Sequence, residues 1–232
     1  RRVKYMVVSY PSNPCGAAAP RSMYESLIGY ARKYGFWLVN DNAYSDIIFD
    51  GREGFSFLSI PGAKEVGVEF FSLSKSFNTT GARISFCIGS QTVVNALKVI
   101  RSQYDFGMFT PIQMGAIAAL TGPQESVAAQ RAEYQRRRDA LCGGFRAAGW
   151  NVPDSQGTMF VWAPIPPQFP SSKAFWNALV DHTGILCTPG PAFGPAGEGY
   201  VRFALVRPAE QLAEAARLIG SSGLLEHGSD RA

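Results

Sequence analysis

The chain has 232 residues and a formal net charge of +4. Apolar residues make up 46% of it and charged residues 17%, a balance that can bury a core and excludes an intrinsically disordered chain. At roughly 100–200 residues per domain, the length allows one large domain or two small ones. The basic residues are spread out, and the dense run from Arg136 to Arg138 fits a solvated helix face, so we expect no nucleic-acid partner.

No apolar run approaches the roughly 18–20 residues that cross a bilayer, and no signal peptide opens the sequence, so we expect no membrane partner. The four cysteines form no CxxC pair and the two histidines are isolated, so we expect no metal site. This pattern favours a cytoplasmic protein whose cysteines are small buried hydrophobic residues. The chain starts with Arg1 and its first residues already have the pattern of a core strand, so we expect a fragment of a longer protein.

The first part of the chain alternates strands with helices. We predict strands at 3–10, 36–39, 66–73 and 83–88, and helices at 20–34, 92–102 and 111–120. The apolar runs are continuous rather than alternating, which indicates a mostly parallel sheet with both faces covered, and the run at 3–10 is predicted to be buried. In such sheets a ligand binds outside the carboxyl ends of the strands.

After Gly122 and Pro123 the pattern changes. We predict a long polar helix at 124–148, then a strand (158–163), a helix (171–183), a strand (185–188), a Gly/Pro-rich loop (189–199), a strand (200–206) and a helix (208–219). This order describes a small α+β domain. The sequence therefore predicts one α/β domain over 1–122, a second domain over 123–225 that includes the long helix, and a frayed tail at 226–232.

Polar residues that could bind a ligand or take part in a reaction follow three of the predicted strands. They are Asn13, Asp41, Ser72, Ser74 and Lys75, with Arg83 eight residues further on. Four of them have a plainer interpretation: Lys75 and Arg83 as surface charges, Asp41 as a cap, and Asn13 as a turn residue. Brought to one sheet edge, however, a carboxylate, an amine and a guanidinium could grip a phosphorylated, nitrogen-containing ring. Arg202 stands inside an apolar run and requires a partner, for which a carboxylate ligand is suitable, whereas Arg207 fits a solvated strand end.

Four segments together resemble class I/II aminotransferases, closest to the branch of LL-diaminopimelate and aspartate aminotransferases. The segments are the Lys75 region 72–83 (SLSKSFNTTGAR), the Asn-Pro-x-Gly-like 10–16 (YPSNPCG), the Asp-x-Ala-Tyr-like 41–44 (DNAY), and 189–204 with Arg202. The resemblance implies a fold-type-I enzyme that depends on pyridoxal 5'-phosphate, with residues 1–122 as part of the large cofactor-binding domain. It also implies a homodimer that transfers amino groups between amino acids and 2-oxo acids in amino-acid biosynthesis.

The resemblance also assigns roles. Lys75 would be the catalytic residue that forms the Schiff base and shuttles protons, and Asp41 would pair with the pyridine nitrogen. Tyr44 and Asn13 would contact the phenolic oxygen of the cofactor. Its phosphate would bind Ser72, Ser74 and Arg83, and Arg202 with Asn13 would bind the substrate carboxylate.

The sequence departs from the family at three places. Ala82 and Ser85 replace the usual Trp and Gly around Arg83, Cys15 replaces the usual Thr and is interpreted as a packing residue, and the N-terminal part of the family is absent. The motifs leave alternatives open: a β-lyase on the same frame, an effector-sensing domain of a regulator, or an inert relic.

Overall fold

The computed structural model describes residues 3–105 and 107–226. By its internal contacts the chain divides into two compact units, one of Arg1–Ser12 with Ala17–Arg131 and one of Asn13–Gly16 with Ala132–Ala232. The division falls inside the long helix α6 (Glu125–Ala147), nine residues beyond the predicted limit at 122. Of the predicted tail, residues 227–232 lie outside the described residues.

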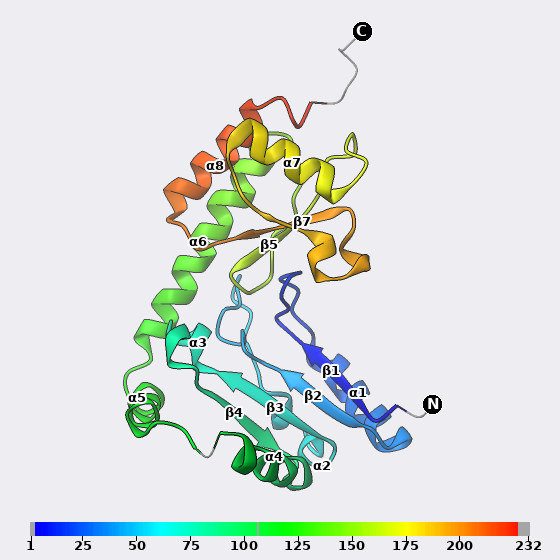
Figure 1. Ribbon diagram of the computed structural model, residues 1–232, viewed down its shortest axis with the longest axis vertical. Helices are drawn as coiled ribbons and strands as arrows, with labels where there is room; N and C mark the ends of the chain where they lie inside the picture. Colours follow the sequence, from blue (N-terminus) through cyan, green and yellow to red (C-terminus); the bar gives the residue numbers. More distant parts are fainter. Residues whose placement is uncertain (1–2, 106, 227–232) are drawn as a thin grey trace. The chain divides into compact units, whose positions relative to one another are not determined.

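The first unit is built on a four-stranded sheet (Figure 1). Its strands are β1 (Tyr5–Ser9), β2 (Trp37–Asp41), β3 (Gly67–Ser72) and β4 (Ser85–Gly89), in that spatial order. The first three strands are parallel and β4 is antiparallel to β3, so the prediction of a mostly parallel sheet is confirmed. The register aligns Ser9 with Asp41 and Asp41 with Phe70. The carboxyl ends of β1, β2 and β3 therefore meet at one edge.

The prediction that the first strand is buried is wrong. Tyr5 and Val7 of β1 are 64% and 58% exposed. The physical reason is position: β1 lies at the edge of this sheet and pairs with β2 alone. A run of apolar residues indicates that a strand could be buried, but it does not identify the elements that would pack against it.

Helix α1 (Arg21–Tyr34) shows why its sequence folds as a helix. Tyr24, Ile28 and Ala31 recur at spacings of four and three, so they share one face and are the buried residues of the helix. They pack with Leu38 of β2 and with Phe57. Gly35 ends the helix in the left-handed conformation, so the helix stops at the predicted residue 34. The other helices of this unit are α2 (Ala63–Val66), α3 (Leu73–Ser76), α4 (Gln91–Tyr104) and α5 (Thr110–Thr121), with short 3₁₀ turns at Phe57–Ser59 and Thr80–Ala82.

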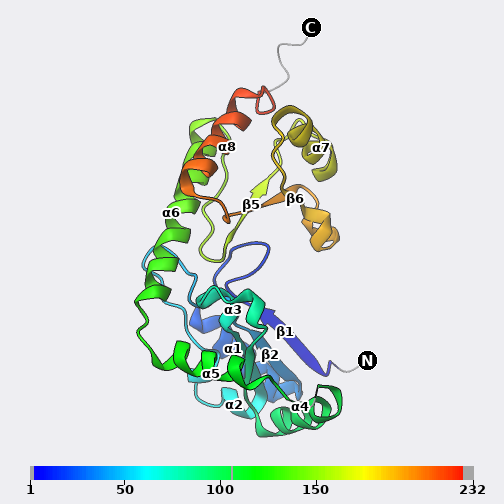
Figure 2. The same ribbon diagram turned by 60° about the vertical axis from the view of Figure 1, so that its left-hand side comes forward.

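The second unit is a three-stranded antiparallel sheet with helices. The spatial order is β5 (Phe160–Pro164), β7 (Tyr200–Ala204) and β6 (Thr188–Pro189). Helix α7 (Ser172–Thr183) connects β5 to β6, and α8 (Ala209–Ser221) follows β7. Helices α6 and α8 lie side by side (Figures 1 and 2). Gly144 allows this close approach, since a Cβ there would lie 2.6 Å from the Ala216 side chain. The 3₁₀ turns of this unit are Gly190–Phe193 and Pro195–Gly197.

The strand predicted at 185–188 begins only at Thr188. The indole nitrogen of Trp176 donates to the carbonyl of Cys187 at 2.9 Å, so a side chain occupies a backbone acceptor that a strand would pair. Among residues 3–105 and 107–226, no helix is both long enough and apolar enough to span a membrane.

The core of the second unit is aromatic, which generates a stability prediction. Phe145 is fully buried, and its ring centroid lies 4.6 Å from that of Trp150 and 5.2 Å from that of Phe203. We expect Phe145→Ala to lower the free energy of unfolding by about 3–5 kcal/mol because it leaves a cavity among these rings. Urea unfolding followed by circular dichroism measures this loss. Leu186→Ala, at a side chain that is 73% exposed, is the control and should change it by less than about 0.5 kcal/mol.

Candidate functional site

Lys75 lies on a very short helix at the carboxyl end of β3. The helix α3 begins because the Ser72 hydroxyl accepts a hydrogen bond from the Ser74 backbone N–H at 3.2 Å, an N-cap. With only four residues, Leu73–Ser76, the helix offers few backbone partners for its carbonyls: the Phe77 N–H donates to the Leu73 carbonyl at 3.1 Å. Its backbone must therefore be held from outside.

Side chains supply further partners. The carbonyls of Leu73, Ser74 and Lys75 accept from Thr79 Oγ1 at 3.0 Å, Thr80 Oγ1 at 3.3 Å and Gln130 Nε2 at 2.6 Å. The run of hydroxyl residues around Lys75 is thus the means by which its turn is fixed. Gln130, which donates to the Lys75 carbonyl, lies 55 positions further along the chain on α6.

The turn after β2 is tied to the same short helix. Ser76 Oγ donates to Asp46 Oδ2 at 2.5 Å, which joins the residue after Lys75 to the segment that carries Tyr44. Lys75 Nζ lies 5.8 Å from the centroid of the Tyr44 ring, within the range of a cation–π contact. Lys75 is half-buried. The sequence motifs that contain these two residues are therefore brought together in space.

Asp41 ends β2 on the neighbouring strand. Its side chain is exposed, and its Oδ1 accepts from the Ala43 backbone N–H at 3.2 Å, which forms an Asx-type turn. The ladder pairs Asp41 with Phe70, two residues before Ser72. Asp41, Ser72 and Lys75 thus lie at one sheet edge, as the sequence predicted.

Arg83 sits beyond α3 in a left-handed turn with φ of 53°. Its guanidinium is exposed and donates to the Thr80 carbonyl at 3.2 Å. Because the Thr80 hydroxyl in turn donates to Ser74, a single residue links Arg83 to the α3 turn. That contact uses one of the five N–H donors of the guanidinium. Ser74 is buried and Ser72 is half-buried.

The two remaining predicted residues, Asn13 and Arg202, belong to the second unit and touch each other. Arg202 Nη1 donates to Asn13 Oδ1 at 2.6 Å, and Nη2 reaches Thr188 Oγ1 at 3.5 Å. The carbon at the centre of the guanidinium lies 4.0 Å from the Phe160 ring centroid and 4.5 Å from that of Phe193. Aromatic rings therefore hold the plane of the guanidinium, and its two outer nitrogens face hydrogen-bonding partners.

Gly16 explains how the loop reaches this position. Its φ is 65°, and a Cβ there would lie 2.5 Å from the Ser155 side chain. Its carbonyl accepts from the backbone N–H groups of Gln156 and Gly157 at 2.8 and 3.0 Å, which fastens the Asn13–Gly16 segment. Only glycine satisfies both demands. Cys15 on this loop is exposed, so its interpretation as a buried packing residue is wrong.

The sequence did not point to the residues that support these side chains. They are Asp46, Ser76, Thr79, Thr80, Gln130, Phe160, Thr188 and Phe193. The hydroxyls next to Lys75 were a visible signal, whereas Gln130 and the two phenylalanines are brought in by the fold from distant positions.

Comparison with known proteins agrees with this arrangement. The family model of aminotransferase class I and II matches residues 1–219. The LL-diaminopimelate aminotransferase of Moorella thermoacetica is 43% identical over 215 residues, which are 93% of this chain and 55% of that protein. The glutamate-pyruvate aminotransferase AlaC of Escherichia coli is 40% identical over 97% of this chain and 56% of its own length.

Solved structures share the fold. BacF of Bacillus subtilis superposes with a TM-score of 0.90 at 34% identity, over 94% of this chain and 56% of that one. A probable N-succinyldiaminopimelate aminotransferase of Thermus thermophilus gives 0.88 at 36% identity, over 94% and 58%. The chain belongs to the aminotransferase class I and II family, whose members depend on pyridoxal phosphate. It spans a little over half the length of the curated relatives it matches.

The constraint at Gly16 generates a prediction. We expect Gly16→Ala to lower the free energy of unfolding by about 1–3 kcal/mol, because it adds a left-handed strain and a clash with Ser155. Urea unfolding measures this. Gly29→Ala is the matched control: it lies inside α1 with open space around a new Cβ, so it should raise stability by up to about 1 kcal/mol. Equal effects at both sites would contradict the constraint.

Proposed function

We propose that this chain carries the catalytic lysine of a pyridoxal-phosphate-dependent aminotransferase, with Lys75 in that role. The observation that carries the proposal is the fixed turn at the sheet edge, where Lys75 Nζ lies 5.8 Å from the Tyr44 ring. When bound, the cofactor supplies an electron sink for the substrate's α-carbon. An amine that extends from this fixed turn can bond the cofactor aldehyde and then, once released, carry a proton.

The residues present fit the cofactor by their chemistry. Asp41 offers an exposed carboxylate on the adjacent strand, suited to hold the proton on the pyridine nitrogen. Tyr44 offers a hydroxyl for the phenolic oxygen. Ser72, Ser74 and Arg83 offer hydroxyl and guanidinium donors for a phosphate; Thr80 links Ser74 to Arg83, and Ser72 caps the turn at Ser74.

Arg202, with Asn13, would bind the α-carboxylate of the substrate. Its two outer nitrogens already donate hydrogen bonds to side-chain oxygens of Asn13 and Thr188. The same two nitrogens can donate to the two oxygens of a carboxylate. The flat contacts of Phe160 and Phe193 keep that edge in one orientation.

For the whole protein we propose amino transfer between an amino acid and a 2-oxo acid in amino-acid biosynthesis. The relatives are named for LL-diaminopimelate and for glutamate and pyruvate, which favours amino transfer over a β-lyase reaction. We further propose a cytoplasmic homodimer. Exposed apolar side chains of α5, among them Met114 and Ile117 at 59% and 53%, support a subunit contact.

The first test of this proposal is chemical labelling. Pyridoxal phosphate followed by borohydride should leave a phosphopyridoxyl group on the peptide that contains Lys75, read by mass spectrometry, because that amine is held beside the other binding groups. The exposed Lys98 is the internal control and should stay unmodified at stoichiometric cofactor. Label spread evenly over surface lysines, or a Lys75→Arg variant that labels like the natural chain, would refute the proposal.

A second test concerns the substrate carboxylate. We expect Arg202→Lys to raise KM for the amino acid about tenfold or more, since a lysine loses the bidentate geometry. Steady-state kinetics of the full-length enzyme measures it. Arg207→Lys, at an exposed position five residues along, is the control and should leave KM unchanged. A KM for Arg202→Lys equal to that control would remove Arg202 from the substrate site.

A further inference from the structure

Glu69 is a buried carboxylate in the middle of β3. Its side chain is 0% exposed, although the strand around it is otherwise mainly apolar. An isolated buried carboxylate is costly, so its presence requires donors. None of the roles proposed above uses this residue.

Three N–H groups satisfy it. Oε1 accepts from Asn42 Nδ2 at 2.9 Å, and Oε2 accepts from Asn40 Nδ2 at 3.0 Å and from the backbone N–H of Phe57 at 2.8 Å. Asn40 and Asn42 are themselves buried. These two asparagines flank Asp41 in the sequence. One carboxylate on β3 therefore grips both neighbours of the residue proposed to face the pyridine nitrogen.

Because of strand geometry, the hydrogen bonds from Asn40 and Asn42 to Glu69 determine the direction of the Asp41 side chain. Side chains alternate across a strand, so Asn40 and Asn42 point to one face and Asp41 to the other. Asn40 pairs with Glu69 in the ladder, and the Asn42 backbone N–H donates to the Phe70 carbonyl at 2.9 Å. The Asp41 carboxylate then closes its own turn onto the Ala43 N–H. The backbone cannot rotate at Asp41 without breaking a contact to Glu69.

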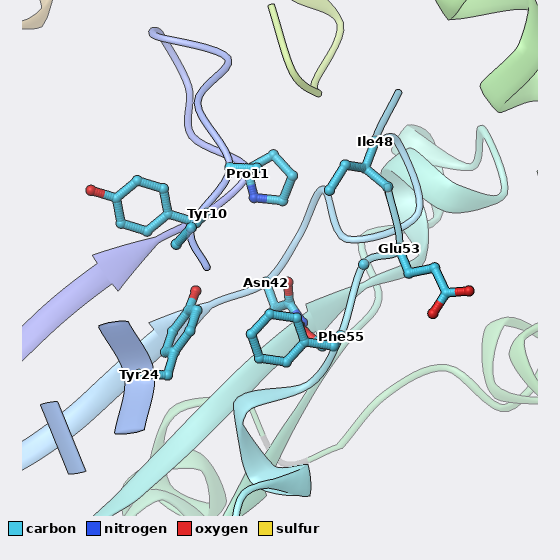
Figure 3. A pocket seen from close by; sticks show the side chains of 10 residues that line it. Tyr10, Pro11, Tyr24, Asn42, Ile48, Glu53 and Phe55 are labelled. Carbon is cyan, nitrogen blue, oxygen red and sulfur yellow. The ribbon is translucent and has the colours of Figure 1, made fainter. Parts of the chain in front are cut away.

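The network continues away from the site. Tyr24 donates from its hydroxyl to Asn40 Oδ1 at 3.2 Å, and burial, with Glu69 as the second cause, raises the pKa of Tyr24 far above its usual value. Tyr24 and Asn42 line a cavity of about 20 Å³ together with Phe55 (Figure 3). That volume holds about one water molecule, so the cavity is too small for an amino acid or the cofactor.

We propose that Glu69 is a positioning residue for the reaction, which acts through Asn40 and Asn42 to fix the direction of the Asp41 carboxylate. The proposal rests on the proposed function, because it concerns the group assigned to the pyridine nitrogen. The contrary interpretation is that Glu69 only stabilises the fold. The two interpretations predict different results for two variants that lose similar stability: only a positioning role predicts that the variant at Glu69 alone disturbs Asp41.

The matched pair is Glu69→Gln and Tyr24→Phe. The first keeps the size of the side chain but turns one acceptor into a donor that faces the Asn42 amide. The second removes the hydrogen bond to Asn40 at the far end of the network and leaves every contact of Glu69 in place. Both leave a buried polar group with fewer partners, so both should lower the melting temperature.

The first measurement uses the cofactor-free protein. Amide hydrogen exchange by NMR should show about tenfold faster exchange at Asn42 and Ala43 in Glu69→Gln, and little change at either in Tyr24→Phe. Equal acceleration in both variants, or wild-type exchange in Glu69→Gln, overturns the proposal. Should Glu69→Gln not fold, Asn42→Ala, which removes one arm of the grip, is held to the same criteria.

The second measurement uses the protein reconstituted with pyridoxal phosphate. If Asp41 is misdirected, the ring nitrogen loses its positive charge, and the pH midpoint of the visible absorbance of the Lys75-linked cofactor rises by on the order of one unit. Tyr24→Phe should keep the wild-type midpoint. An unshifted midpoint in Glu69→Gln also overturns the proposal. Failure of the wild-type protein to attach cofactor at Lys75 refutes the proposed function instead, and the exchange experiment still decides on Glu69.

Discussion

A helix of four residues can pair only few of its own backbone groups, and the arrangement around Lys75 follows from that constraint. Ser72 caps its first turn, and Thr79, Thr80 and Gln130 take its carbonyls. Each donor fixes the backbone on either side of Lys75, so the flexible side chain starts from a rigid base. The same contacts draw Arg83 and the Asp46 segment toward that base, which is why several motifs converge there.

In the second unit, neighbouring side chains fix the orientation of the Arg202 guanidinium. A half-buried arginine needs both a flat environment for its plane and acceptors for its edge. Phe160 and Phe193 supply the first, and Asn13 and Thr188 supply the second. Gly16 takes a left-handed conformation against Ser155 and so fastens the loop that carries Asn13. The glycine of the Asn-Pro-x-Gly-like motif is therefore required by the backbone conformation and by the close approach of Ser155.

Behind Asp41 lies a buried polar network rather than an apolar core. Glu69, Asn40 and Asn42 satisfy one another between two parallel strands. A network of this kind specifies one register more strictly than apolar packing does, because a shift by one residue would leave a buried carboxylate without donors. The register in turn decides which residue of β2 stands at the sheet edge.

The sequence by itself determined the order of the strands and of the longer helices, a mostly parallel first sheet, and the motifs that identify the family. Those features are local: periodicity, punctuation by Gly and Pro, and short runs around Lys75 and Asp41. Only the tertiary structure decided that the first strand is an exposed edge, that Gln130 closes the Lys75 turn, and that Glu69 grips both neighbours of Asp41. The physical reason is that burial and hydrogen bonding of these groups depend on partners 12 to 55 positions away, which no local pattern encodes.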